Sequence, residues 1–198
     1  MFYKRLQMTP KKQFIVFLMF VVGFLVILMI AFGRRPNTNT SNSSSSSKVF
    51  EVLEYQDKDA RLTSLISGPI TGDDEHRSIK ITITRNSRLI EVFQGYQGKV
   101  IKSESYPNNV DAYDEFINAL AKVNYGKKRR SDSDSEIGIC ATGRRYVYEV
   151  FDENNDSVSR TWAGSCTKGT VYGSSEAINN LFRMQITDYS KLISGVNY

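Results

Sequence analysis

The chain has few of the residues that most often carry chemistry, with two cysteines, one histidine and one tryptophan among its 198 residues. A single histidine excludes the paired-histidine metal motifs, and no Cys-x-x-Cys redox pair is present. The sequence also lacks a glycine-rich phosphate-binding loop and a Gly-x-Ser-x-Gly nucleophile motif. We therefore predict no cofactor, no metal ion and no catalytic residue.

Acidic residues are missing from the first 48 positions, which hold seven Lys and Arg. Residues 49–198 hold nineteen Lys and Arg against twenty-one Asp and Glu, so the formal charge of +5 comes from the N-terminal part. The remainder lacks the broad excess of basic residues with which proteins bind phosphate backbones. We predict no nucleic-acid partner.

The longest apolar segment contains nineteen uncharged residues, from 14 to 32. A helix rises about 1.5 Å per residue, so this segment matches the roughly 30 Å hydrocarbon core of a bilayer. Four basic residues precede it and three follow it, which favours a cytoplasmic N-terminus. We predict a basic cytoplasmic tail at residues 1–13 and a signal-anchor helix in the cell membrane at residues 14–33, which binds the lipid bilayer.

A cleaved signal peptide is the alternative, because Ala31-Phe32-Gly33 has the small-x-small pattern of a cleavage site. The apolar segment is longer than the roughly 7–15 residues of most signal peptides, so we favour an uncleaved anchor and leave cleavage after Gly33 open. Residues 34–48 are rich in Ser, Asn and Thr. This composition predicts a flexible linker before an extracytoplasmic domain at residues 49–198.

The periodicity of residues 49–198 predicts one α+β domain with an antiparallel sheet. Alternating apolar residues indicate a meander of three strands, and three- and four-residue spacing indicates two helices. The predicted order is meander, helix, disulfide-closed hairpin and helix, with the helices on one face of the sheet. The predicted strands are 79–84, 89–93, 99–105, 144–151 and 157–163, and the predicted helices are 109–123 and 174–186. Residues 49–55 fit a short strand, and residues 60–67 fit either a strand or a helical turn.

The second hairpin is predicted to turn at Asn154, so that opposed residues have numbers that add up to about 308. This register pairs Tyr146 with Trp162 and Tyr148 with Arg160. It places five side chains on one face of the sheet, namely Tyr146, Tyr148, Val150, Val158 and Trp162.

Both cysteines, Cys140 and Cys166, lie in the same Gly-x-Cys-x-x-Gly pattern and flank this hairpin. The register places them almost opposite each other, and the predicted topology exposes them to an oxidising compartment, so we predict a disulfide. A catalytic thiol with His76 as its base is the weaker interpretation, because no local motif supports it.

Four tyrosines near the ends of predicted elements are candidate binding residues: Tyr96, Tyr106, Tyr125 and Tyr172. Tyrosines at loop tips suit recognition of a surface protein or a glycan. Half-buried packing is the ordinary alternative.

The stretch 138–189, with GICATGRRYVYE, TWAGSC and LFRMQITDY, resembles uncharacterised single-pass envelope proteins of small host-dependent bacteria. The resemblance covers about a quarter of the chain and implies a location in the cell envelope, without implying an activity.

Together these features predict a membrane-anchored, extracytoplasmic interaction or structural module. One alternative is an envelope enzyme whose acids meet only in the fold, for instance Asp73 and Glu75 with His76. Another is a glycan- or solute-binding domain, which requires a concave apolar site lined by the tyrosines.

Overall fold

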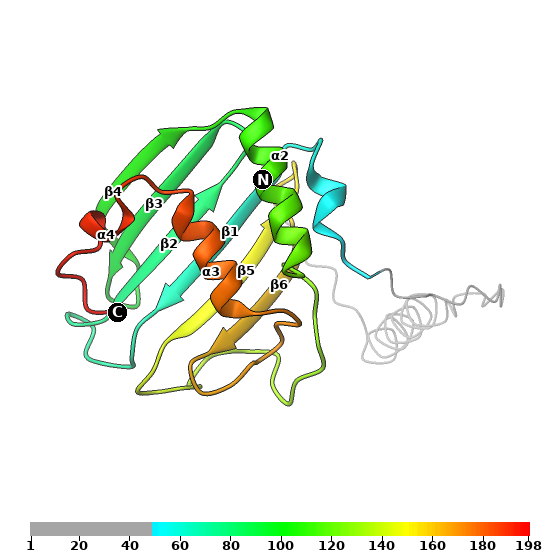
Figure 1. Cartoon of the computed structure of the whole chain (residues 1–198). Coiled ribbons are helices and arrows are strands. Elements are labelled where there is room, and N and C mark those ends of the chain that lie inside the picture. Colours follow the sequence, from blue (N-terminus) through cyan, green and yellow to red (C-terminus); the bar gives the residue numbers. More distant parts are fainter. Residues whose placement is uncertain (1–48) are drawn as a thin grey trace, which may run out of the picture. The chain divides into compact units, whose positions relative to one another are not determined.

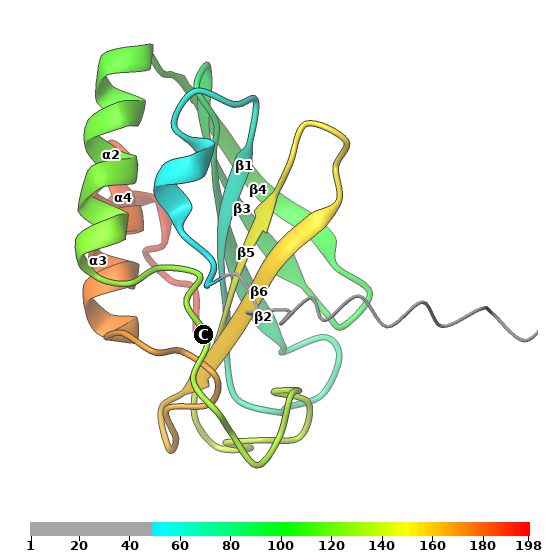
Figure 2. The same cartoon turned by 90° about the vertical axis from the view of Figure 1, so that its right-hand side faces the viewer.

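The computed structural model describes residues 49–198, which form one six-stranded antiparallel sheet with helices on one face (Figure 1 and Figure 2). The α+β class predicted from the sequence is therefore confirmed. The predicted tail 1–13, membrane anchor 14–33 and linker 34–48 lie outside the described residues. Among the helices of residues 49–198, none combines the length and the apolar character that a membrane span requires.

The predicted meander is present and has one additional strand, because residues 60–67 belong to the sheet. Its strands are β1 (Arg61–Ser67), β2 (Arg77–Ile83), β3 (Ser87–Gln94) and β4 (Lys99–Pro107). β5 (Arg145–Phe151) pairs with the free edge of β1, and β6 (Ser157–Gly164) pairs with β5. The resulting strand order is β4-β3-β2-β1-β5-β6.

Both predicted helices are also confirmed, and a polar side chain caps each of them. The Asn109 side chain accepts the backbone N–H of Ala112 at 2.9 Å before α2 (Val110–Lys122). Ser174 accepts the N–H of Ala177 at 3.3 Å before α3 (Ser175–Met184). Each cap satisfies a backbone donor that the first turn of a helix leaves without an intrahelical partner.

The core lies between these helices and the sheet, where the isoleucines of β2 are buried. Phe116 of α2 and Phe182 of α3 meet edge to face there, with ring centroids 5.2 Å apart. A short helix, α4 (Tyr189–Leu192), follows α3. The predicted strand at residues 49–55 is wrong, since Val52–Tyr55 form a short 3-10 helix, η1, and Val52 is buried in this core.

The predicted register of the second hairpin is wrong by one residue beyond the turn. Phe151 lies opposite Ser157, as predicted, but Val150 lies opposite Ser159, so Val158 is the extra residue of a bulge. A one-residue shift moves every following side chain to the other face. Trp162 therefore lies opposite Val147, on the face away from the helices, and Val158 is also outside the predicted cluster.

The antiparallel pairing brings three connections to one end of the sheet (Figure 1). They are the β1–β2 loop, the β3–β4 turn, and the segment that joins α2 to β5. The face of the sheet away from the helices is buried at Trp162 and Val147 and half-buried at Leu65 and Phe93. This end of that face holds the candidate site.

Candidate functional site

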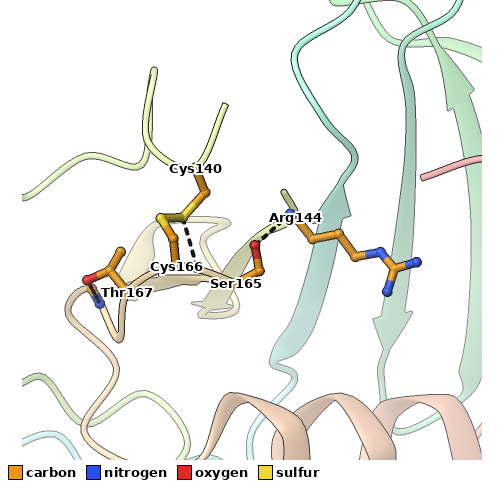
Figure 3. The surroundings of a disulfide bond; sticks show 6 residues. Cys140, Arg144, Ser165, Cys166 and Thr167 are labelled. Carbon is orange, nitrogen blue, oxygen red and sulfur yellow. Dashed lines mark hydrogen bonds between the residues drawn. A yellow bond between two sulfur atoms is a disulfide. The ribbon is translucent and has the colours of Figure 1, made fainter. Parts of the chain in front are cut away.

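The predicted disulfide joins the segment before β5 to the turn after β6 (Figure 3). The Cα atoms of Cys140 and Cys166 are 5.6 Å apart. Beside the bridge, Ser165 Oγ accepts the backbone N–H of Arg144 at 3.1 Å (Figure 3). A Cβ atom at position 164 would lie 2.5 Å from the Cys140 sulfur, which explains the glycine there. The bridge thus fixes the segment around Cys140 against the end of β6.

Two further contacts position the segment on either side of Cys140. Arg160 Nη2 donates to both carboxylate oxygens of Glu136, each at 2.7 Å. The backbone N–H of Ile70, in the β1–β2 loop, donates to the carbonyl of Ala141 at 2.7 Å. Ile137 therefore lies between two anchored residues, Glu136 and Ala141, and 84% of its surface is exposed.

Tyr96, at the tip of the β3–β4 turn, is held at several points. Its hydroxyl donates to the Thr71 carbonyl at 2.9 Å, and its backbone N–H donates to Asp73 Oδ1 at 2.8 Å. Its ring is stacked on His76, with centroids 4.2 Å apart. Tyr96 is nevertheless 53% exposed. This combination of rigidity and exposure suits a recognition residue, because ordering it on binding costs little entropy.

A hollow of about 370 Å³ opens beside Tyr96 and is called the Tyr96 hollow below. Its lining residues include Ile70, His76, Tyr96, Glu136, Ile137 and Arg145. A second hollow, of about 320 Å³, shares Ser67, His76 and Tyr96 with the first and extends over Leu65 and Phe93. His76 and Tyr96 therefore stand between two adjoining, partly apolar hollows.

The four candidate tyrosines have different environments. Tyr96 lines the hollow, and Tyr172 is 64% exposed elsewhere. Tyr106 is half-buried, and its hydroxyl donates to the Thr187 carbonyl at 3.1 Å. The structure does not bring these three side chains together at one site.

The placement of Tyr125 corrects the expectation of an exposed binding residue. Tyr125 is 1% exposed in the helix-side core, and burial raises its pKa well above the ordinary tyrosine value. Its hydroxyl donates to the carbonyls of Thr63 and Glu149, at 2.9 and 2.8 Å. Tyr125 thus contributes to the core and connects β1 with β5.

The acids of the enzyme alternative do not converge on His76. Asp73 holds the turn through the N–H of Tyr96, and Glu75 lines a different hollow from His76. His76 Nδ1 lies 3.1 Å from the Pro69 carbonyl, which can only accept, so Nδ1 carries the proton. Within residues 49–198, no group of three or more His, Cys, Asp and Glu side chains is arranged to hold a metal ion.

Sequence reasoning missed Ile70, Ile137 and Arg145. Ile137 had a usable signal, since it is a large apolar residue directly after the charged stretch 127–136. Arg145 had none, because arginines at the start of a strand are ordinary and nothing in the sequence distinguishes it from the adjacent Arg144.

No protein-family model matches the chain, and the comparisons with curated proteins and with solved structures give no match either.

Proposed function

We propose that the protein is a membrane-anchored, extracytoplasmic interaction module that binds an apolar peptide segment of a partner protein in the Tyr96 hollow. The observation that carries the proposal is the convergence of three exposed apolar side chains, Ile70, Tyr96 and Ile137, on one hollow. They come from three separate connections. Single exposed apolar residues are common on protein surfaces, whereas a gathered set is typical of an interaction site.

The rigidity of the hollow supports the same function. The disulfide, the Glu136–Arg160 ion pair and the stack of Tyr96 on His76 hold its walls. A preformed site avoids the entropic cost of ordering side chains on binding. The size of the hollow also lies within the range of roughly 300–1,000 Å³ of ordinary ligand sites.

A peptide fits the walls better than a glycan does. Ile70 and Ile137 offer aliphatic surface and no side-chain hydrogen bonds for sugar hydroxyls. His76 already covers one face of the Tyr96 ring, on which a sugar would otherwise stack. The extracytoplasmic location follows from the predicted anchor, and the Cys140–Cys166 bridge agrees with an oxidising compartment.

A random peptide library displayed on phage, selected on the full chain in detergent micelles, tests this function. Selected peptides should bind Tyr96→Ala and Ile137→Asp variants at least about tenfold more weakly, because each variant removes apolar contact area. Tyr172→Ala and Met184→Asp are matched controls, since both residues are exposed and neither lines the hollow.

The controls should bind the selected peptides as the unmodified chain does, and thermal unfolding should show that all four variants are folded. A library that yields no specific peptide would overturn the proposal. So would peptides that bind the Tyr96 and Ile137 variants unchanged.

A further inference from the structure

Arg145 is the most buried of the Arg, Lys, Asp and Glu side chains in residues 49–198, with 8% of its surface exposed. It lies at the start of β5, opposite Ser67 of β1 and Gly164 of β6, and it lines the Tyr96 hollow. Burying a guanidinium costs free energy unless an opposite charge or several hydrogen bonds replace the lost water.

Most of this compensation is missing in the described part of the chain. Arg145 Nη2 donates to the Gly68 carbonyl at 2.6 Å, and the buried Nε has no partner. None of the ion pairs within residues 49–198 includes Arg145. Glu136 also lines the hollow, but Arg160 already binds both of its carboxylate oxygens. The hollow therefore contains a positive charge without a counter-ion.

We infer that the Tyr96 hollow recognises a carboxylate beside an aliphatic side chain, and that Arg145 binds this carboxylate. The inference rests on the proposed function and specifies the chemistry of its ligand. A guanidinium presents its N–H groups in a planar fork that matches a carboxylate. Ile70, Ile137 and Tyr96 supply the apolar wall for the neighbouring side chain. The carboxylate comes either from the C-terminus of the peptide or from an Asp or Glu side chain.

The selected peptides provide the test, because each can be made with and without its charge. One series replaces the C-terminal carboxylate by an amide, and another replaces Asp and Glu by Asn and Gln. Binding is measured by fluorescence anisotropy with the full chain in detergent micelles. Loss of the relevant carboxylate should weaken binding at least about tenfold, as expected for a charged hydrogen bond. The series that responds identifies the source of the carboxylate.

An Arg145→Gln variant tests the assignment to this residue, and Arg144→Gln is its matched control. Both changes remove one positive charge, but Arg144 does not line the Tyr96 hollow. Arg145→Gln should bind the charged and neutral peptides equally, while Arg144→Gln should keep the preference. In the unmodified chain, the nuclear magnetic resonance signal of Arg145 Nε–H should shift with the charged peptide and stay in place with its neutral analogue. This measurement decides the assignment if Arg145→Gln does not fold.

The outcomes separate this inference from the proposed function. Equal binding of charged and neutral peptides by the unmodified chain overturns the inference and leaves the proposed function intact. A preference that persists in Arg145→Gln overturns the assignment to Arg145. Absence of any specific peptide overturns both.

Discussion

The imidazole of His76 lies flat against the phenol of Tyr96, with ring centroids 4.2 Å apart and an angle of 7° between the planes. His76 is buried and comes from the β1–β2 loop, whereas Tyr96 is half-exposed and comes from the β3–β4 turn. The backbone N–H of Gly95 also donates to the His76 carbonyl at 2.9 Å. The two connections therefore form one rigid unit, in which an exposed tyrosine has a single orientation.

Replacing Tyr96 with Phe tests how much of this rigidity the hydroxyl supplies. The change keeps the ring stack and removes the bonds between the hydroxyl and the Thr71 backbone. Since these bonds are exposed, the free energy of unfolding should fall by about 1 kcal/mol or less, as measured by urea denaturation. Tyr172→Phe serves as the control and should leave stability unchanged. A loss of several kcal/mol would show that the turn depends on this hydroxyl more than its exposure suggests.

The hydroxyl of Tyr125 should matter more, because it is buried and donates to two carbonyls on neighbouring strands. Tyr125→Phe keeps the ring in the core but leaves Thr63 and Glu149 without this donor. We expect a loss of about 1–3 kcal/mol in the free energy of unfolding, larger than for Tyr96→Phe in the same urea experiment. Equal effects of the two substitutions would contradict the structural role assigned to Tyr125.

The buried tyrosines also predict how stability depends on pH. Burial raises the pKa of Tyr113, Tyr125 and Tyr148 above the ordinary value near 10. The unfolded chain loses these protons at about pH 10 while the folded chain keeps them, so their contribution is complete below pH 10 and decreases as the pH rises further.

Tyrosinate absorbance and circular dichroism, followed together from neutral to strongly alkaline pH, test this dependence. Tyr113, Tyr125 and Tyr148 should ionise only together with the loss of the folded signal. Ionisation of all tyrosines in one transition near pH 10, with the fold intact, would be the opposite result.

The sequence predicted the elements well where one local pattern decides them. The alternating isoleucines at 79, 81 and 83 identified a half-buried strand, and Asn109 marked the start of a helix. The predicted register of the second hairpin, although wrong by one residue, placed Cys140 almost opposite Cys166 and led to the correct disulfide. In each case the deciding residues belong to one helix, one strand or one hairpin.

Features that depend on packing between distant segments were missed. The bulge at Val158 has no motif of its own, yet its single extra residue moved Trp162 to the other face of the sheet. Tyr125 follows a helix in the sequence, which suggested exposure, but the chain turns inward there and its hydroxyl reaches Thr63 on β1. The Tyr96 hollow could not be predicted from the sequence either, because its walls come from three connections that are far apart in the chain.

Removal of the disulfide tests two effects in one variant: the stability of the fold and the binding of peptides at the proposed site. Cys140 and Cys166 are 26 positions apart, so in the chain-entropy model the bridge stabilises the fold by about 3–4 kcal/mol. A Cys140→Ser, Cys166→Ser double variant should therefore unfold at a lower urea concentration, and a thiol reductant should have no further effect on it.

The same variant should also loosen one wall of the hollow. The bridge fixes the segment that carries Glu136 and Ile137, whereas Tyr96 keeps its contacts with His76 and Asp73. Limited proteolysis should cleave the variant first within residues 127–143, and peptides selected on the unmodified chain should bind it more weakly. If the variant lost stability but bound these peptides unchanged under conditions where it is folded, the wall formed by Ile137 would not contribute to recognition. The proposed site would then be confined to Tyr96, His76 and the adjoining face of the sheet.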